Sequence, residues 1–516
     1  MHSYSITERN LSLMSNNNSD DGESCDLSNN LSELIKESYS SGETDGVQDA
    51  FSTNNVLSQL SAAVNLDAEE VAKQLVGAAI DAAGTNRGRL AAMINAILAS
   101  CCECGDDGED GSNNTTTSHP RIAVAILDHI DDLNSVDATT IVEPDIVSFS
   151  LVYYALQTSE QNSKSPQSTF ILERAQRLAK KVAGSQRRRA LAAERRRGGN
   201  AKEIDAEKHL QSLFGKDICI LHETDDLIVV SKPSGVVCYH TKKTTAGKIT
   251  ASRKKKGRSE STKGGAKQMV DISLVDALLD IPISLSTVNP TARGITHRID
   301  RGTSGTIVLA KTDEAHLKLV ALFFLRKVKK KYLALVPGCS IGNENGSDSS
   351  VADDKKPLPL TMGSTGVIDA SVGGRPAHST YNVVGEYGKR EQSSLPDALL
   401  LEINTLTGRK HQVRVHCASI GYPIFMDVKY WPSSKSAKDR EKTKERVQKK
   451  KRQKSTTTEH TDMSILPNAI ARLLDDPNQQ QERFFLHASS LSVPELGIVV
   501  NAPLPSWWVD TMDQLN

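Results

Sequence analysis

Hydrophobic and polar positions divide the chain into a helical front part and a strand-rich back part. Between about 55 and 183, apolar residues recur at the i, i+3, i+4 spacing of amphipathic helices, as in EEVAKQLVGAAI and GRLAAMINAILA. Residues 1–54 are rich in Ser, Asn, Asp and Gly and predict a disordered acidic and polar tail. From about residue 215, short apolar runs predict strands at 218–221, 227–230, 307–310, 332–336 and from 398.

Polar stretches interrupt the strand-rich part without ending it. They lie near 241–267, 338–357 and 433–481, and apolar segments resume after each. We therefore predict one domain over 215–508 that carries three insertions. The basic stretch 184–214, which includes SQRRRALAAERRRGGNAKE, is predicted to be a linker. It is equally compatible with an RNA-contacting arm, a nuclear signal or a solvated basic tether.

Two helices are predicted inside this domain. Thr312 can cap a helix whose apolar face includes Leu317 and Phe324 and which runs into RKVKKK. A shorter helix is expected near 413–420, with Gly421 as its C-terminal cap. Each helix is adjacent in sequence to a predicted strand, so side chains in the connecting loops would stand on a rigid scaffold.

Charge is distributed unevenly, although the 516 residues sum to a net charge of zero. Residues 1–165 contain 7 Lys and Arg against 26 Asp and Glu, while the remainder contains 56 against 37. A basic back part indicates a polyanionic partner. No apolar run reaches membrane-spanning length and no secretory leader begins the sequence, so we expect no membrane partner. The CCEC cluster at 101–104 lacks a second ligand pair, so we expect no metal site.

The helical front part has one weaker pattern. VEPDIVSFSLVYYALQ, at 142–157, resembles the start of a pentatricopeptide repeat, and 87–101 offers at most a second degenerate unit. Helix-pair repeats need several neighbours to bury their faces. A plain helical scaffold or docking region is therefore favoured over an RNA-reading repeat array.

Two clusters could carry chemistry. HRIDRGTSGT, at 297–306, places Asp300 between two arginines just before a buried apolar run. Alone, this stretch is compatible with a surface turn and a local ion pair. The second cluster carries Arg409, His411, Arg414 and His416 within eight residues. Guanidinium and imidazole groups beside an apolar strand favour contact with phosphate or with a carboxylate partner.

Together, HRIDRGTSG and LTGRKHQVRVH resemble the RluA-type RNA pseudouridine synthases. DDLIVVSKPSGVVCYH, KKKYLALVPG, RPAHSTYNVV, GYPIFMDVKY and RFFLHASSLSVP resemble further segments of that family, in the family's order. The resemblance covers about 215–505 outside the insertions. It implies an α+β pseudouridine synthase fold with a large mixed, mostly antiparallel sheet and a catalytic cleft.

The resemblance also implies roles for individual residues. Asp300 matches the catalytic carboxylate, Tyr332 the ring that stacks on the target base, and Arg414 the cation that pairs with the aspartate. Residues expected to contact substrate are Arg298, Arg301, Thr303, Arg409, His411 and Lys232; for Lys232 a role in the KPSG turn is equally plausible. We expect His297 and His487 to be structural, and His411 to act through hydrogen bonds rather than as an acid or base.

The family's activity implies that uridine in rRNA or tRNA is isomerised to pseudouridine. The bond from N1 to ribose C1′ breaks and a bond from C5 to C1′ forms, so neither a redox cofactor nor ATP is needed. RNA with the target in a structured loop is the expected partner, and we expect a monomer. The alternative is a catalytically silent RNA-binding or ribosome-assembly factor. The polar insertions suggest a eukaryotic source, with the compartment open.

Two residues depart from the family's pattern. Met426 stands where the family usually has Gly, and Val413 stands where Ile is common. The methionine is expected to affect the turn before Asp427.

Overall fold

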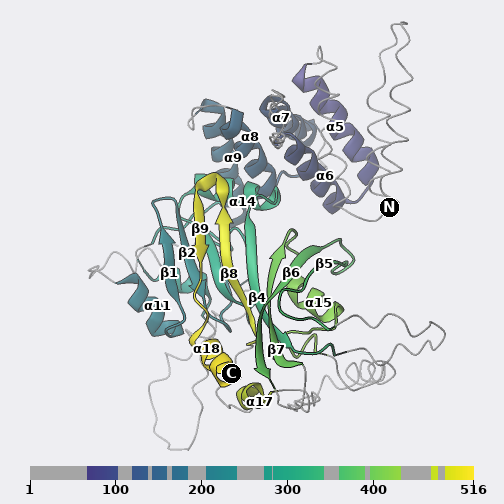
Figure 1. Ribbon diagram of the computed structural model, residues 1–516. Coiled ribbons are helices and arrows are strands. Elements are labelled where there is room, and N and C mark those ends of the chain that lie inside the picture. The colour runs from purple at the N-terminus through teal and green to yellow at the C-terminus, as the bar shows by residue number, and fades with distance from the viewer. Residues whose placement is uncertain are drawn as a thin grey trace, which may run out of the picture.

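The computed structural model describes two packed parts of the chain (Figure 1). We call residues 67–183 the helical module and residues 205–515 the sheet domain. The described residues are 67–102, 119–136, 142–159, 165–183, 205–240, 272–281, 283–341, 359–389, 395–431, 467–474 and 483–515. The predictions for 1–54, 184–204 and 241–267, and most of those for 338–357 and 433–481, fall outside these residues.

The helical module contains five helices within the described residues. They are α5 (Ala68–Ala83), α6 (Arg87–Ser100), α7 (Pro120–Val136), α8 (Ile146–Ser159) and α9 (Pro166–Ala183). Asn86 caps α6 by accepting from the Arg89 N–H at 3.0 Å, and Asp145 caps α8 by accepting from the Val147 N–H at 2.8 Å. The middle of α8 is buried on all sides, which makes α8 the centre of the module. No helix of the described residues is long and apolar enough to cross a membrane.

Within the described residues, the sheet domain is built on one sheet of nine strands. Its order is β1-β2-β3-β8-β4-β7-β6-β5, with β9 paired to β8. The strands are β1 (Cys219–Glu223), β2 (Leu227–Lys232), β3 (Ser304–Ala310), β4 (Lys329–Pro337), β5 (Thr365–Asp369), β6 (His378–Lys389), β7 (Pro396–Thr405), β8 (Leu486–Val493) and β9 (Ile498–Asn501). Only the pairing of β3 with β8 is parallel among these strands. The predicted α+β class with a large mixed, mostly antiparallel sheet is confirmed.

Helices around this sheet correct several predicted boundaries. They are α11 (Ala206–Phe214), α13 (Leu274–Leu279), α14 (Asp313–Phe324), α15 (Gln412–Ser419), α17 (Asn468–Leu474) and α18 (Ser506–Leu515). The predicted linker thus ends before α11, which buries Leu210 against the sheet. The predicted insertion at 433–481 contains α17, which buries Ile470. The domain also extends through α18 beyond residue 508, because Trp508 and Leu515 are core residues.

The segment RKVKKK was wrongly predicted to end the helix that starts after Thr312. Thr312 does cap α14, accepting from the Ala315 N–H at 3.2 Å. However, α14 ends at Phe324, and Arg326 adopts a left-handed backbone with φ 58° that a continuing helix does not permit. Lys329 then begins β4, in which Lys329 and Lys331 are exposed. The alternation of lysines therefore belongs to a strand.

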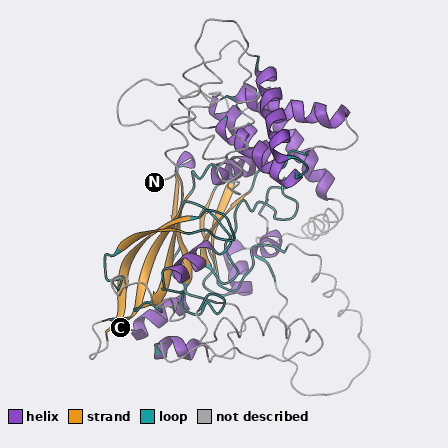
Figure 2. Ribbon diagram, turned by 90° about the vertical axis from the view of Figure 1, so that its right-hand side faces the viewer, coloured by secondary structure: helices purple, strands orange, loops and turns teal. Residues whose placement is uncertain are grey.

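The helical module and the sheet domain share one hydrophobic core. Buried side chains connect Leu75 of α5 and Leu151 of α8 with Leu317 of α14 and Val308 of β3. Polar contacts reinforce this interface, because Gln176 donates to Asp313 at 2.8 Å and Lys327 donates to the Tyr154 hydroxyl at 3.1 Å. Seen from the side, the module again lies at one end of the sheet (Figure 2). The module is therefore packed on the domain rather than tethered to it.

Three buried histidines predict loss of stability in mild acid. Burial lowers the pKa of His297 to about 3 and the pKa of His316 and of His487 to about 4 each. The unfolded chain then binds protons more tightly than the folded chain, so the stabilisation is complete above about pH 6.5 and is lost as pH falls toward 4. We expect the free energy of unfolding to fall by about 3 kcal/mol between pH 6 and pH 5, roughly 1 kcal/mol for each histidine. Denaturant titrations at several pH values across this range measure the fall. His316→Leu is expected to reduce its slope by about one third, and an unchanged slope would contradict the assignment.

Candidate active site

Asp300 lies in the loop that enters β3. All residues of β3 are buried, so the strand anchors this loop in the centre of the sheet. The loop is closed by the Thr303 N–H, which donates to the Asp300 carbonyl at 3.2 Å. Gly302 has no room for a side chain, because an added Cβ would meet the ring of Phe484. The Asp300 carboxylate itself remains about one-fifth exposed.

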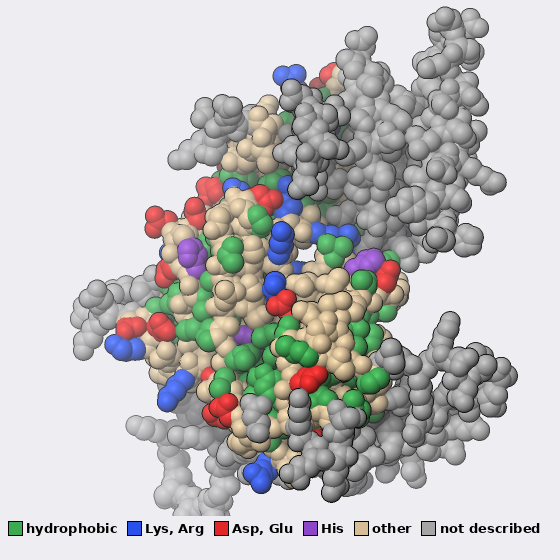
Figure 3. All heavy atoms as spheres, viewed as in Figure 1, with side chains coloured by type: hydrophobic (Ala, Val, Ile, Leu, Met, Phe, Trp, Pro, Cys, Tyr) green, Lys and Arg blue, Asp and Glu red, His purple; other side chains and the backbone are tan. Residues whose placement is uncertain are grey.

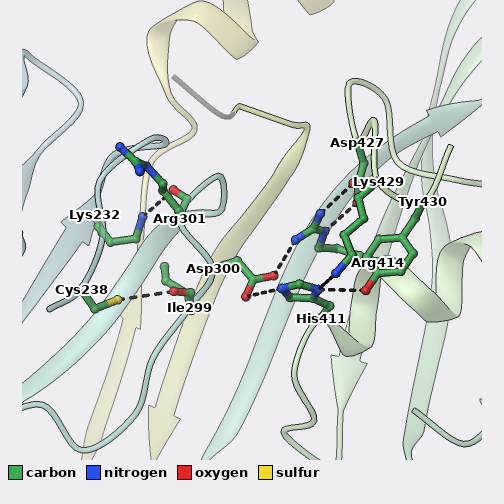
Figure 4. Close-up of polar contacts among 10 residues, drawn as sticks. All are labelled: Lys232, Cys238, Ile299, Asp300, Arg301, His411, Arg414, Asp427, Lys429 and Tyr430. Carbon is green, nitrogen blue, oxygen red and sulfur yellow. Dashed lines mark hydrogen bonds and ion pairs between the residues drawn. The ribbon is translucent and has the colours of Figure 1, made fainter. Parts of the chain in front are cut away.

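Arg414 connects Asp300 to a second, buried carboxylate (Figure 4). It projects from α15, and its Nη1 lies 3.1 Å from Asp300 Oδ2. Its Nε and Nη2 donate to the two oxygens of Asp427 at 2.7 and 2.8 Å. A bidentate pair of this kind fixes the guanidinium plane. Arg414 is therefore held by Asp427 and presents its remaining nitrogen to Asp300.

Aromatic rings complete the surroundings of Arg414. The guanidinium carbon lies 4.3 Å from the ring centre of Phe484 and 5.0 Å from that of Tyr430. Burial alone would lower the pKa of Arg414, but hydrogen bonds and opposite charge from Asp427 and Asp300 outweigh burial and raise that pKa. The guanidinium is thus a permanent positive charge beside the Asp300 carboxylate.

Asp427 was not among the predicted site residues. It is 2 % exposed and stands in the turn GYPIFMD, directly after Met426. Met426 adopts φ 65°, a left-handed conformation that favours glycine. The turn therefore retains its shape despite methionine, at a backbone cost of about 1–2 kcal/mol. An aspartate embedded in an apolar turn was the sequence signal for a buried ionic partner.

His411 faces Asp300 from the start of α15. Its backbone is left-handed, with φ 62°, and its Nε2 lies 3.7 Å from Asp300 Oδ1. Lys429 Nζ lies 3.2 Å from Nδ1 and can only donate, so Nδ1 accepts and Nε2 carries the hydrogen. Burial lowers the pKa of His411, and the raising effect of Asp300 does not overcome it. His411 therefore presents a neutral N–H to Asp300.

A cavity of about 650 Å³ opens in front of Asp300, in the size range of ligand sites. The sheet domain contributes cationic side chains to its lining: Arg298, Arg326, Lys330, Arg375, Arg409 and Arg414. Figure 3 shows Lys and Arg side chains gathered around the hollow between the two parts of the chain. Burial lowers the pKa of Lys330, and its ammonium has no hydrogen bond or ion pair within the described residues. These features suit an anionic ligand.

Tyr332 also lines this cavity, two residues after Lys330 on β4. Residues two apart on a strand point to the same face. Burial raises the pKa of Tyr332 to about 12, with a further contribution from Asp300. Its ring is thus neutral and faces the same space as the Asp300 carboxylate.

The remaining predicted site residues separate into two groups. Arg298, Thr303 and Arg409 line the cavity, and Arg409 also donates from Nε to the Pro376 carbonyl at 3.0 Å. Arg301 does not line it; its Nε donates to the Gly235 carbonyl at 2.9 Å. Figure 4 shows Arg301 beside Lys232, away from the Asp300 carboxylate.

The surroundings of Lys232 favour a role in the KPSG turn over the phosphate contact that was equally compatible with the sequence. Its side chain is fully buried, and Nζ donates to the carbonyls of Pro233, Val236 and Arg301 at 2.9, 2.8 and 3.2 Å. Burial lowers its pKa to about 8. Lys232 therefore fastens the KPSG turn to the loop that carries Asp300.

Lys232→Met is expected to lower stability rather than substrate affinity. The change removes the side-chain donor of the buried Pro233 and Val236 carbonyls, at about 1–3 kcal/mol for each group that water does not reach. The Arg301 carbonyl still accepts from the Gly235 N–H at 2.8 Å. We expect a loss of roughly 3 kcal/mol in the free energy of unfolding, measured by denaturant titration. The folded Lys232→Met variant should bind RNA with the affinity of the parent chain. A weakened RNA affinity at unchanged stability would instead support a contact between Lys232 and phosphate.

Two histidines of the site region have structural partners. His297 Nε2 accepts from the Val308 N–H at 3.0 Å, and burial lowers its pKa to about 3. His487 contacts the Ser304 hydroxyl at 2.9 Å through Nδ1. Within the part of the chain that the structure describes, no three His, Cys, Asp or Glu side chains form a metal-binding group.

Known proteins share this region of the chain. Residues 226–419 match the family model described as RNA pseudouridylate synthase. A Bacillus subtilis protein named "Uncharacterized RNA pseudouridine synthase YlyB" is 30% identical over 42% of this chain and 58% of its own length. "Ribosomal large subunit pseudouridine synthase D" of Nitrosomonas europaea is 33% identical over 42% of this chain and 50% of its own length. "RNA pseudouridine synthase 4, mitochondrial" of Arabidopsis thaliana is 27% identical over 54% of this chain and 53% of its own length.

The chain thus spans little more than half the length of these relatives. The family match includes Asp300, Tyr332 and Arg414, while Asp427 follows it. Together the matches support the RluA-type family and identify the sheet domain as a pseudouridine synthase fold. The matched residues begin well after the helical module.

Proposed function

We propose that this protein is an RNA pseudouridine synthase and that Asp300 is its catalytic carboxylate. The observation that carries the proposal is the position of Asp300. It lies in a cationic cavity of a pseudouridine synthase fold, and Arg414 holds it at 3.1 Å. An arginine at this distance aims the carboxylate at the cavity, as attack or proton abstraction at the sugar requires.

The reaction rearranges bonds without adding or removing atoms. The bond from uracil N1 to ribose C1′ breaks, the base turns within the cavity, and C5 bonds to C1′. The proton on C5 leaves and N1 gains a proton. Asp300 either forms a bond to C1′ that C5 later displaces, or removes the proton from C2′ and returns it to C2′ when C5 bonds to C1′. Both routes need an ionised carboxylate next to the ribose, and neither uses a redox step.

The neighbours of Asp300 position the carboxylate and bind the base and the phosphates. Arg414 is a positioning residue, because Asp427 fixes its orientation through two hydrogen bonds. The Tyr332 ring offers a stacking surface for the extruded base, which is worth roughly 1–3 kcal/mol. Extruding a base from its stack costs a few kcal/mol. Lys330 and Arg409 line the same cavity and suit the phosphates on either side of the target.

The substrate we propose is rRNA or tRNA with the target uridine in a structured loop. One relative is named as a ribosomal large-subunit enzyme, which favours rRNA. The competing function is RNA binding in ribosome assembly without catalysis. An intact set of Asp300, Tyr332 and Arg414 in one cavity favours the enzyme, since binding alone does not require an arginine-paired aspartate.

Tritium release separates these two functions. Total RNA labelled with [5-³H]uridine, from cells that lack this protein, is incubated with the purified full chain. Pseudouridine formation releases the C5 hydrogen to water, so counts in the solvent report the reaction. We expect the released tritium to match the number of specific uridines that are modified. RNA binding without release would favour the assembly factor.

A further inference from the structure

We infer that the helical module forms the second wall of the RNA cleft and that Asp145 and the cavity-lining face of α6 bind nucleotides flanking the target uridine. This inference rests on the proposed function, since it names the part of the chain that selects the RNA for the same site. It assigns a binding surface to residues that the family match does not include.

The cavity in front of Asp300 is lined from two sides. One side is the sheet domain; the other consists of Gly88, Ala91, Ala92, Asn95 and Ala96 of α6, together with Asp145. These positions of α6 recur at three- and four-residue intervals, so they lie on one helix face. A face of small side chains leaves space for a ligand that already contacts Asp300.

Charge differs between the two walls. The sheet-domain side carries the cationic residues of the cavity, whereas the described lining of the helical side includes one charged residue, Asp145. A carboxylate repels phosphate and accepts hydrogen bonds from ribose hydroxyls or base amino groups. The phosphate backbone is thus expected along the sheet domain. Bases and riboses of the flanking nucleotides would then face α6.

A polar cluster holds Asp145 in position for this role. Asn95 is 6% exposed and donates to Asp145 Oδ1 at 3.3 Å. Ser148 donates to Asn95 at 2.7 Å, and the N–H groups of Val147 and Ser148 donate to Asp145 Oδ1 at 2.8 and 3.0 Å. Among the described residues, Asp145 Oδ2 receives only a 3.4 Å contact from Asn95. One exposed carboxylate oxygen is therefore fixed at the edge of the cavity and open to a ligand donor.

The module is also rigid enough to act as a wall. It shares a continuous core with the sheet domain, and its polar contacts to α14 and to Lys327 lie on the same interface. Elements fixed on a scaffold position binding groups more accurately than loops do. Selection of RNA by such a wall needs no movement of the module.

Crosslinking tests the placement without relying on activity. Total RNA labelled with 4-thiouridine is bound to the purified full chain and irradiated, and crosslinked peptides are identified by mass spectrometry. We expect crosslinks in peptides that contain 87–96 or 142–148 as well as in the sheet domain. Crosslinks confined to the sheet domain would overturn the inference, even if tritium release shows an active synthase. Crosslinks to α6 without tritium release would support RNA binding by the helical module and would contradict the proposed reaction.

Two variants then test selection. Ala92→Trp fills the cavity from α6 and is expected to raise KM roughly tenfold or more for an RNA carrying a uridine that the parent chain modifies. Asp145→Asn retains the cap of α8, because an asparagine oxygen also accepts from the backbone. In the parent chain, a 2′-deoxy substitution or a base change at a flanking nucleotide is expected to raise KM. In Asp145→Asn that increase in KM is expected to disappear. Gln167→Trp, an exposed neutral position on α9 away from the cavity, is the control for a bulky side chain. Parent-like values for both variants, or losses that follow melting temperature alone, would overturn the inference.

Discussion

Asp300→Asn is expected to lower pseudouridine formation by roughly 10⁴-fold, because an amide can neither attack C1′ nor take up a proton from C2′. The substitution keeps the size of the side chain and an oxygen that can accept from Arg414, which lies 3.1 Å away. Folding and RNA affinity should therefore stay near those of the parent chain. Single-turnover tritium release with saturating enzyme measures the chemical step, and a gel-shift titration with the same RNA measures binding.

A matched control comes from the surface of α18. Asp510 is exposed and lies outside the cavity, so Asp510→Asn should retain the parent's rate within about twofold. If Asp300→Asn binds RNA and still forms pseudouridine at the rate of Asp510→Asn, the carboxylate is not the catalytic group.

Arg414→Met is expected to damage both stability and catalysis. It leaves Asp427 as an unpaired charge that is 2 % exposed, and breaking a buried pair costs about 3–5 kcal/mol. It also removes the donor that aims Asp300, for which a loss of roughly 10²–10³ in the chemical step is expected. Denaturant titration and single-turnover release measure the two effects separately.

A double variant separates structure from catalysis. Arg414→Met with Asp427→Leu removes both buried charges, so we expect it to be more stable than Arg414→Met alone. Its catalytic loss should remain, because no donor faces Asp300. A double variant that regains both stability and rate would show that Arg414 serves the fold only.

The sheet domain was largely predictable from sequence, because local patterns and family motifs agree there. Thr312 marks the start of α14 through its capping hydroxyl, and β3 is visible as a continuous apolar run. RKVKKK was misplaced, because lysines suit an exposed helix end as well as the exposed face of a strand. Only the left-handed Arg326 and the pairing of β4 with its neighbours decide between them.

The site was predictable in part, for a different reason. The residues around Asp300 come from distant segments that all lie on motifs, but a motif does not say which side chains meet. Lys232 illustrates the limit: a lysine beside a turn suggests phosphate contact, but one of its three carbonyl acceptors lies on the loop that carries Arg301. Asp427 was missed because its partner lies thirteen residues earlier, on α15. The placement of α6 against the cavity required the packed structure, since no local pattern encodes it.

Pseudouridine mapping across all RNA in cells lacking this protein tests the central claim most directly. The cells are complemented in parallel with the parent chain, Asp300→Asn and Asp510→Asn at equal expression. We predict that a small set of uridines in rRNA or tRNA loses modification, and that the parent chain and Asp510→Asn restore it while Asp300→Asn does not. Restoration of those sites by Asp300→Asn, or no change at any uridine when the protein is absent, would contradict the account.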